Sequence, residues 1–211
     1  MIRHHLTDAL LMAYAAGTLP EAFSLVAASH VSLCDDCRAR LMAYEAVGGA
    51  VLDCIGLDGG ETAMLSGPEA CFARPVASRA APRRRGVLPG PLAGYVGGGV
   101  EAVKWRTLGM GVRQAILPTS RAASARLLYI PAGQAVPDHG HRGMELTLVL
   151  QGAFRDATDR FGVGDLEIAG QELEHIPTAE PGADCICLAA TDAPLRFKEW
   201  LPRVLQPVFR S

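Results

Sequence analysis

The stretch His30-Val-Ser-Leu-Cys34-Asp-Asp-Cys37 decides how the N-terminal part of this 211-residue chain folds. His30 and Cys34 are four residues apart and share one face if the helix continues through that turn, and Cys37 follows by a CxxC step. A tetrahedral metal ion held by these side chains needs a fourth ligand, and His4 and His5 lie upstream as candidates. Zinc favours such a closed set of thiolates and imidazoles, in which its role is structural.

The first fifty-odd residues are predicted to form three helices around this cluster. Thr7 can cap a first helix that ends near Gly17, and Thr18-Leu-Pro-Glu21 fits a capping box for the second. Acidic residues from Asp35 onward favour the start of a third. About 55 residues of helix bury little surface, so a bound metal would compensate for a small core. The alternatives are a redox CxxC, which normally accompanies a βαβ pattern absent here, or two unrelated buried thiols.

The pattern His30-x-x-x-Cys34-x-x-Cys37 after an upstream histidine resembles the zinc-binding anti-sigma (ZAS) domain. Most of the chain is similar to ChrR-type anti-sigma factors, which join this domain to a cupin. The resemblance implies that the N-terminal domain binds an extracytoplasmic-function (ECF) sigma factor and blocks its access to RNA polymerase. It also implies that the zinc ligands are His5, His30, Cys34 and Cys37, with His4 as the lesser contender.

One stretch departs from the family pattern. In the family, a final helix after a linker contributes to the partner contact. The corresponding stretch here, near 66–80, contains Pro68 and Pro75. Proline inside a helix removes a hydrogen bond and clashes with the preceding turn, so we expect this helix to be short or broken.

A second metal-ligand pattern, His139-Gly-His141-Arg-Gly-Met-Glu145, lies in sequence that is typical of short strands. Alternation along a regular strand would place these three ligands on one side. With its flanking glycines the pattern resembles the first cupin motif, and His175 matches the histidine of the second. Such a site binds zinc, our first choice, or iron, manganese or nickel. The alternatives are a purely structural metal or an empty barrel.

The chain as a whole is predicted to be a multidomain α + β protein. Short alternating segments at regular spacing from about residue 93 onward indicate an antiparallel β cupin barrel of the jelly-roll type. We therefore expect a zinc-bound helical bundle over 1–80, linker-like from about 57, then a linker over 81–92, and a cupin domain over 93–211. The strands are expected near 111–118, 125–130, 145–151, 152–156 and 185–190.

Composition excludes several classes of function. The net charge is only −2, so no overall field favours nucleic acid, and no apolar stretch is long enough to span a membrane. The apolar run from Ala9 is closely preceded by histidines and Asp8, so we expect no signal peptide. Cysteines in CxxC and CxC spacing then indicate metal or redox chemistry in a reducing compartment, here the cytoplasm. Cys185 and Cys187 are expected to be buried in a strand, or alternatively to have a redox or sensory role.

These observations predict a cytoplasmic anti-sigma factor with no catalytic residue, in which a metal-binding cupin senses a stress signal. The resemblance implies that the signal is singlet oxygen or another oxidant. Partner contacts are expected on the first helices at Leu10, Met12, Tyr14 and Phe23, which could equally be core. The alternative is a metal-dependent cupin enzyme, a dioxygenase or isomerase, with an accessory zinc module. A DNA-binding zinc protein is disfavoured by the weak positive charge.

Overall fold

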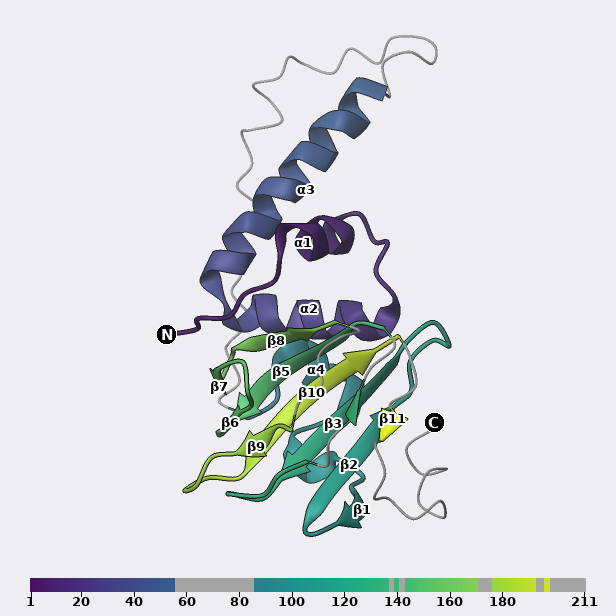
Figure 1. Cartoon of the computed structure of the whole chain (residues 1–211). Coiled ribbons are helices and arrows are strands. Elements are labelled where there is room, and N and C mark those ends of the chain that lie inside the picture. The colour runs from purple at the N-terminus through teal and green to yellow at the C-terminus, as the bar shows by residue number, and fades with distance from the viewer. Residues whose placement is uncertain (56–85, 137–138, 141–142, 171–175, 193–195, 198–211) are drawn as a thin grey trace.

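The computed structural model describes residues 1–55, 86–136, 139–140, 143–170, 176–192 and 196–197. Helices gather in the N-terminal part, and antiparallel strands make up most of the rest (Figure 1). This arrangement confirms the predicted fold class of a helical bundle followed by an antiparallel β region of the cupin type. The predicted final helix near 66–80 and the arginine run at 83–85 lie outside the described residues.

Three helices form the N-terminal region: α1 (Asp8–Ala15), α2 (Glu21–Leu33) and α3 (Asp35–Ile55). Thr7 caps α1 as predicted, because its Oγ1 accepts a hydrogen bond from the Leu10 N–H at 3.3 Å. Gly17, with φ of +67°, follows the end of α1. Only Cys34 separates α2 from α3, and its extended backbone ends α2. Among the described helices, none is both long and apolar enough to cross a membrane.

The capping box predicted for α2 is wrong. Pro20 occupies the N-cap position, and no side chain caps the helix there. The Thr18 hydroxyl instead donates to the Ala13 carbonyl at the end of α1. Glu21 accepts hydrogen bonds from the Tyr95 hydroxyl and from the Ser120 N–H, both far away in sequence. The side chains of Thr18 and Glu21 thus form hydrogen bonds with other residues and do not cap α2 together.

The described residues of the β region form three antiparallel sheets. The strands predicted from hydrophobic alternation are all present, within one to two residues of the expected bounds. The large sheet has the order β1 (Arg106–Gly109), β2 (Val112–Leu117), β3 (Ser124–Ile130), β10 (Cys185–Thr191), β5 (Glu145–Gln151) and β8 (Leu166–Ala169). A second sheet has the order β7 (Arg160–Gly162), β6 (Ala153–Arg155), β9 (Thr178–Ala179), and β11 (Arg196–Phe197) pairs with β4 (His139–Gly140).

The two faces of the large sheet belong to different cores. On β10, Ile186 and Leu188 belong to one buried cluster, whereas Cys185 and Cys187 belong to another. Strand alternation produces this division, because successive side chains point to opposite faces. The cluster that holds the cysteines also includes Phe154 of the smaller sheet, so it is the interior between the two sheets.

The other face of the large sheet shares its core with the N-terminal helices, which the sequence analysis treated as a separate module. Helix α2 contacts β3, β5 and β10. Phe23 and Val26 of α2 lie in the same hydrophobic cluster as Leu127 and Leu188 of the sheet. Helices α1 and α3 contact α2 as well and lie on its side that faces away from the sheet (Figure 1). Helix α2 is therefore sandwiched between the other helices and the sheet.

The predicted linker ends earlier than residue 92. Leu88 and Leu92 are buried in the shared core, and Leu92 belongs to a short helix, α4 (Gly90–Val96), that contacts α2. A 3₁₀ helix, η3 (Val100–Ala102), follows before β1 begins. Pro89, one of the prolines of the predicted linker, is the N-cap of α4, and Gly97, beyond that linker, has a left-handed conformation after the last turn of the helix. The remaining domain boundaries stay predictions.

Candidate metal centre

Four side chains from separate elements converge where α2 meets α3. His5 lies on the extended arm before α1, His30 lies in the last turn of α2, and Cys34 and Cys37 flank the start of α3. One ligand atom from each residue lies within 4.8 Å of the others. His5 Nδ1 is 3.3 Å from Cys34 Sγ and 3.7 Å from Cys37 Sγ, and His30 Nε2 is 3.3 Å from Cys37 Sγ. The structure thus brings together the four residues that the family resemblance implied.

These separations fit a tetrahedral zinc ion. With Zn–S bonds of about 2.3 Å and Zn–N bonds of about 2.0–2.1 Å, sulfur and nitrogen ligands of a regular tetrahedron are about 3.6 Å apart. The three measured N–S separations bracket this value. Three of the residues are buried and His5 is half-buried, so the site is closed, as in structural rather than catalytic zinc sites. That these residues bind zinc remains a prediction.

The surroundings of the cluster favour uncharged ligands. Burial lowers the pKa of His30 to about 4, so its imidazole is neutral and able to bind a metal at pH 7. Burial, together with the neighbouring Cys34, raises the pKa of the Cys37 thiol to about 11. A thiol in this environment loses its proton only if a cation compensates the charge. A divalent ion supplies that compensation.

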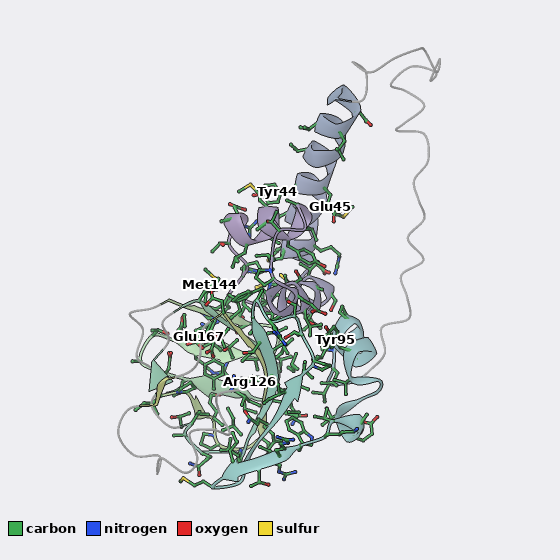
Figure 2. The ribbon with its side chains drawn as sticks, turned by 90° about the vertical axis from the view of Figure 1, so that its right-hand side faces the viewer. Tyr44, Glu45, Tyr95, Arg126, Met144 and Glu167 are labelled. Carbon is green, nitrogen blue, oxygen red and sulfur yellow. The ribbon has the colours of Figure 1, made fainter. Side chains whose placement is uncertain are left out.

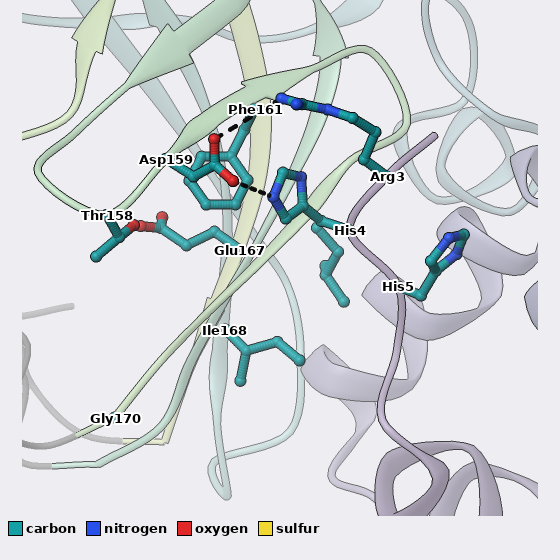
Figure 3. Close-up of a pocket in the computed structure, with 10 residues that line it drawn as sticks. Arg3, His4, His5, Thr158, Asp159, Phe161, Glu167, Ile168 and Gly170 are labelled. Carbon is teal, nitrogen blue, oxygen red and sulfur yellow. Dashed lines mark hydrogen bonds and ion pairs between the residues drawn. The ribbon is translucent and has the colours of Figure 1, made fainter. Parts of the chain in front are cut away.

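The two neighbouring histidines have different surroundings. His5 is directed toward the cysteines, whereas the His4 imidazole lies over the Phe161 ring and contacts Asp159, at 3.0 Å between Nε2 and Oδ2 (Figure 3). The His4 Nδ1 atom is 3.6 Å from the Asp165 carboxylate. Spacing alone could not separate the two histidines, because adjacent residues on an arm have the same reach. The fold separates them by pairing His4 with the β region.

The predicted cupin site lies only partly within the described residues. Glu145 is buried at the start of β5 and accepts a hydrogen bond from the Thr147 hydroxyl at 3.1 Å. His139 lies in β4, but its side chain is not among those described, and His141 and His175 lie outside the described residues. The predicted ligand set His139, His141, Glu145 and His175, and any metal in it, therefore stay predictions.

Two polar groups in this region were missed by the sequence analysis. Arg126 and Glu167, labelled in Figure 2, are nearly inaccessible to solvent. Burial lowers the pKa of the Arg126 guanidinium, and the charge of Glu145 partly offsets this. Each of the two residues is a charged residue inside an otherwise apolar strand, which is the sequence feature that could have indicated it. In a half-buried sheet such a residue normally faces solvent.

Cys185 and Cys187 are buried on the same face of β10, as predicted, with their Sγ atoms 3.5 Å apart. The hydrogen bond between the two thiols, burial and the nearby carboxylates of Glu167 and Glu145 raise the pKa of Cys187. A buried thiol with a raised pKa is a poor nucleophile. The geometry is therefore that of two packed side chains.

Comparison with known proteins assigns the whole chain to a family. Residues 96–194 match the family model of the ChrR cupin-like domain. The chain is 64% identical over 217 residues to the anti-sigma-E factor ChrR of Cereibacter sphaeroides, covering 99% of each protein. It is also similar to the anti-sigma ChrR in the crystal structure of its complex with SigE from Rhodobacter sphaeroides, with a TM-score of 0.74 and 64% identity. That match covers 91% of this chain and all of the ChrR chain.

Proposed function

The chain belongs to the ChrR family of anti-sigma factors, and from this premise we propose that it binds an ECF-type sigma factor through its N-terminal helices. Binding would keep the sigma factor from RNA polymerase. The observation that carries the proposal is 64% identity along 99% of both this chain and its curated relative, an anti-sigma factor. The solved relative is a complex with SigE, and this chain covers all of that ChrR chain. The family role is regulatory rather than enzymatic.

The surface of α3 supports this proposal. Beyond its first two turns the helix projects away from the rest of the structure (Figure 1). Its exposed apolar side chains, more than half accessible, are Met42, Val47, Val51 and Leu52. Val47 and Val51 are four residues apart and share one face of the helix, so this pair is the part of α3 best placed for an interaction site. A helix of this kind suits the groove or helical surface of another protein.

The four contacts predicted on the first helices divide into two classes. Leu10 and Phe23 are buried in the core and are not available to a partner in this conformation. Met12 is about half exposed and Tyr14 is half-buried, so α1 can extend the contact surface of α3. The alternative, that these residues belong to the core, therefore holds for Leu10 and Phe23.

Zinc is the ion that we propose for His5, His30, Cys34 and Cys37. Bound there, it would be a structural cross-link between the arm, α2 and α3. Cys34 and Cys37 lie at the start of α3, and His30 lies on α2, the helix buried against the sheet. An ion bound by all three would therefore fix the start of α3 to α2. The angle at which α3 leaves the molecule would then depend on the ion.

For the β region we propose a sensory role in the cytoplasm, with a metal in the cupin and singlet oxygen or another oxidant as the signal. The support is the match of this region to the ChrR cupin-like family and the pair of adjacent thiols in its interior, which only an oxidant small enough to enter the barrel would reach. Cys187→Ser tests the thiols: the variant should release less sigma factor than the wild type after exposure to singlet oxygen.

Co-purification tests the main proposal. The tagged chain, expressed in a bacterium with the sigma factor encoded in the same genome, should retain that protein at a 1:1 ratio in light scattering after size-exclusion chromatography. In a transcription assay, the chain should prevent RNA polymerase from transcribing a promoter that this sigma factor recognises. A chain that elutes alone, with full transcription in its presence, contradicts the proposal.

A further inference from the structure

The arm before α1 is attached to the β region rather than to the helices that follow it. The tight turn at residues 162–165 joins β7 to β8, and the arm lies against it. The Asp165 side chain is only 5% exposed, and its Oδ1 accepts hydrogen bonds from the Arg3 N–H at 2.6 Å and the His4 N–H at 3.1 Å. Its Oδ2 accepts from the Gly162 N–H at 2.8 Å, which fixes the carboxylate within the turn.

The backbone of His4 is held on both sides. Its carbonyl accepts a hydrogen bond from the Leu166 N–H at 3.3 Å, beside the bond from its own N–H to Asp165. The next residue along the chain is His5, whose Nδ1 lies 3.3 Å from Cys34 Sγ. A residue that directly follows a backbone with both polar groups bound has little freedom to leave the cluster.

Gly164 in this turn has φ of +86°, a backbone conformation that residues with a side chain rarely adopt, and it packs against the Ile2 side chain of the arm. An open hollow of about 910 Å³ borders the contact, lined by Arg3, His4 and His5 on one side and by β7 and β8 residues on the other (Figure 3).

We propose that the β7–β8 turn of the cupin region is the outer shell of the N-terminal metal centre, with Asp165 positioning His5 through the backbone of Arg3 and His4. This inference rests on the metal centre in the proposed function. It adds that the cupin sets how firmly the ion is held. Strand β8 begins at this turn and pairs along its length with β5, where Glu145 lies opposite Ala169. A rearrangement inside the barrel would therefore reach the metal centre through one strand.

The test is the rate of zinc loss from the full-length, zinc-loaded chain to an excess of a chromogenic chelator. Asp165→Asn keeps the size of the side chain, but an amide has a single acceptor oxygen, so its NH2 group must face either the two N–H donors of the arm or the Gly162 N–H. We expect about tenfold faster zinc release, the lower end of what loss of an outer-shell partner costs. The Co²⁺-substituted variant should show altered ligand-field bands, because His5 would no longer be held in place.

Arg3→Pro supplies a second variant, which removes the 2.6 Å hydrogen bond from the side of the arm and changes no residue of the β region. It should also release zinc faster. Asp159→Asn is the matched control: Asp159 contacts the side chains of Arg3 and His4 but not their backbone, so release should stay within about twofold of the wild type.

The outcomes separate the inference from its premise. Wild-type protein that binds no zinc overturns both the metal centre and this inference. Wild-type protein that holds zinc, with Asp165→Asn and Arg3→Pro releasing it at the wild-type rate, overturns the inference alone. Faster release from both variants, with Asp159→Asn unchanged, supports it.

Discussion

Helices α2 and α3 are adjacent in sequence and together with Cys34 between them carry three of the four predicted metal ligands, yet their surroundings are opposite. Eight of the thirteen residues of α2 are buried, between the sheet on one side and α1 and α3 on the other. On α3, Cys37 and Leu41 are buried, and most of the residues that follow are exposed. Figure 2 shows the contrast, with Tyr44 and Glu45 on the projecting helix and Arg126 within the β region.

The contrast assigns different tasks to the two helices. The apolar residues of helix α2 are buried inside the molecule. The helix can therefore fix the orientation of the N-terminal region, but it has little apolar surface left for a partner. Helix α3 keeps apolar side chains in solvent, at a cost that binding to another protein can recover. The metal cluster lies at the junction and connects the buried helix to the free one. The following predictions test this division of roles, from the largest expected effect to the smallest.

Loss of a thiolate ligand should abolish zinc binding at the cluster and greatly weaken binding of the sigma factor. Cys37→Ser removes a ligand from a closed four-coordinate site, so we expect loss of one equivalent of zinc per chain and a decrease in sigma-factor affinity of at least about a hundredfold. Metal content by mass spectrometry and titration calorimetry measure the two effects. Cys185→Ser changes a buried cysteine outside the cluster and should leave zinc content intact. A Cys37→Ser protein that keeps zinc and binds its partner would disprove the role of the cluster.

Truncation of a buried side chain on α2 should affect stability far more than truncation on α3. Phe23, only 4% exposed, packs in the core shared with the sheet, so Phe23→Ala should lower the free energy of unfolding by about 3–5 kcal/mol. Met42→Ala on α3, 63% exposed, should change it by less than about 0.5 kcal/mol. Chemical denaturation followed by circular dichroism gives both values. Equal effects would mean that α2 is not the buried helix of the pair.

A charge on the exposed part of α3 should weaken binding without affecting folding. Leu52 is 71% exposed, and Leu52→Asp should lower sigma-factor affinity by about tenfold to a hundredfold, mainly through faster dissociation. The melting temperature should not change. Met110→Asp is the matched control, because Met110 is equally exposed at 73% but lies in the β1–β2 turn. If both variants bind equally well, α3 is not the contact surface.

The smallest effect concerns the first turn of α2. The Tyr95 hydroxyl and the Ser120 N–H donate to the Glu21 carboxylate and lower its pKa below the ordinary value. A carboxylate whose pKa is lower in the folded state stabilises the fold fully above its unfolded-state pKa of about 4.3, and the contribution is lost as the pH falls through the folded-state pKa. Glu21→Gln should therefore melt slightly lower than the wild type at pH 7, and the difference should disappear near pH 3.

Thermal unfolding across this pH range measures the Glu21 effect. Glu45→Gln serves as the control for the loss of one exposed carboxylate, because Glu45 is exposed on α3. A melting difference for Glu21→Gln that stays constant from pH 7 to pH 3 would show that the carboxylate charge is not involved.

Local chemistry was the part of the fold that could be predicted. The Thr7 cap, the helix starting at Asp35 and the strands over 112–117 and 185–191 follow from interactions between residues close in sequence. The capping box failed because Thr18 and Glu21 found partners elsewhere. The linker was predicted too long because glycine and proline mark the ends of a short helix as readily as they mark a loop.

The sequence by itself determined the ligand types and their spacing, the α + β class and, through similarity, the family. Only the tertiary structure decided which of two adjacent histidines faces the cysteines, that α2 is buried on the sheet, and that Asp165 lies against the arm. The physical reason is the range of the interactions. Capping, helix periodicity and strand alternation act within a few residues, whereas burial and hydrogen bonds between residues 160 positions apart depend on how the whole chain packs.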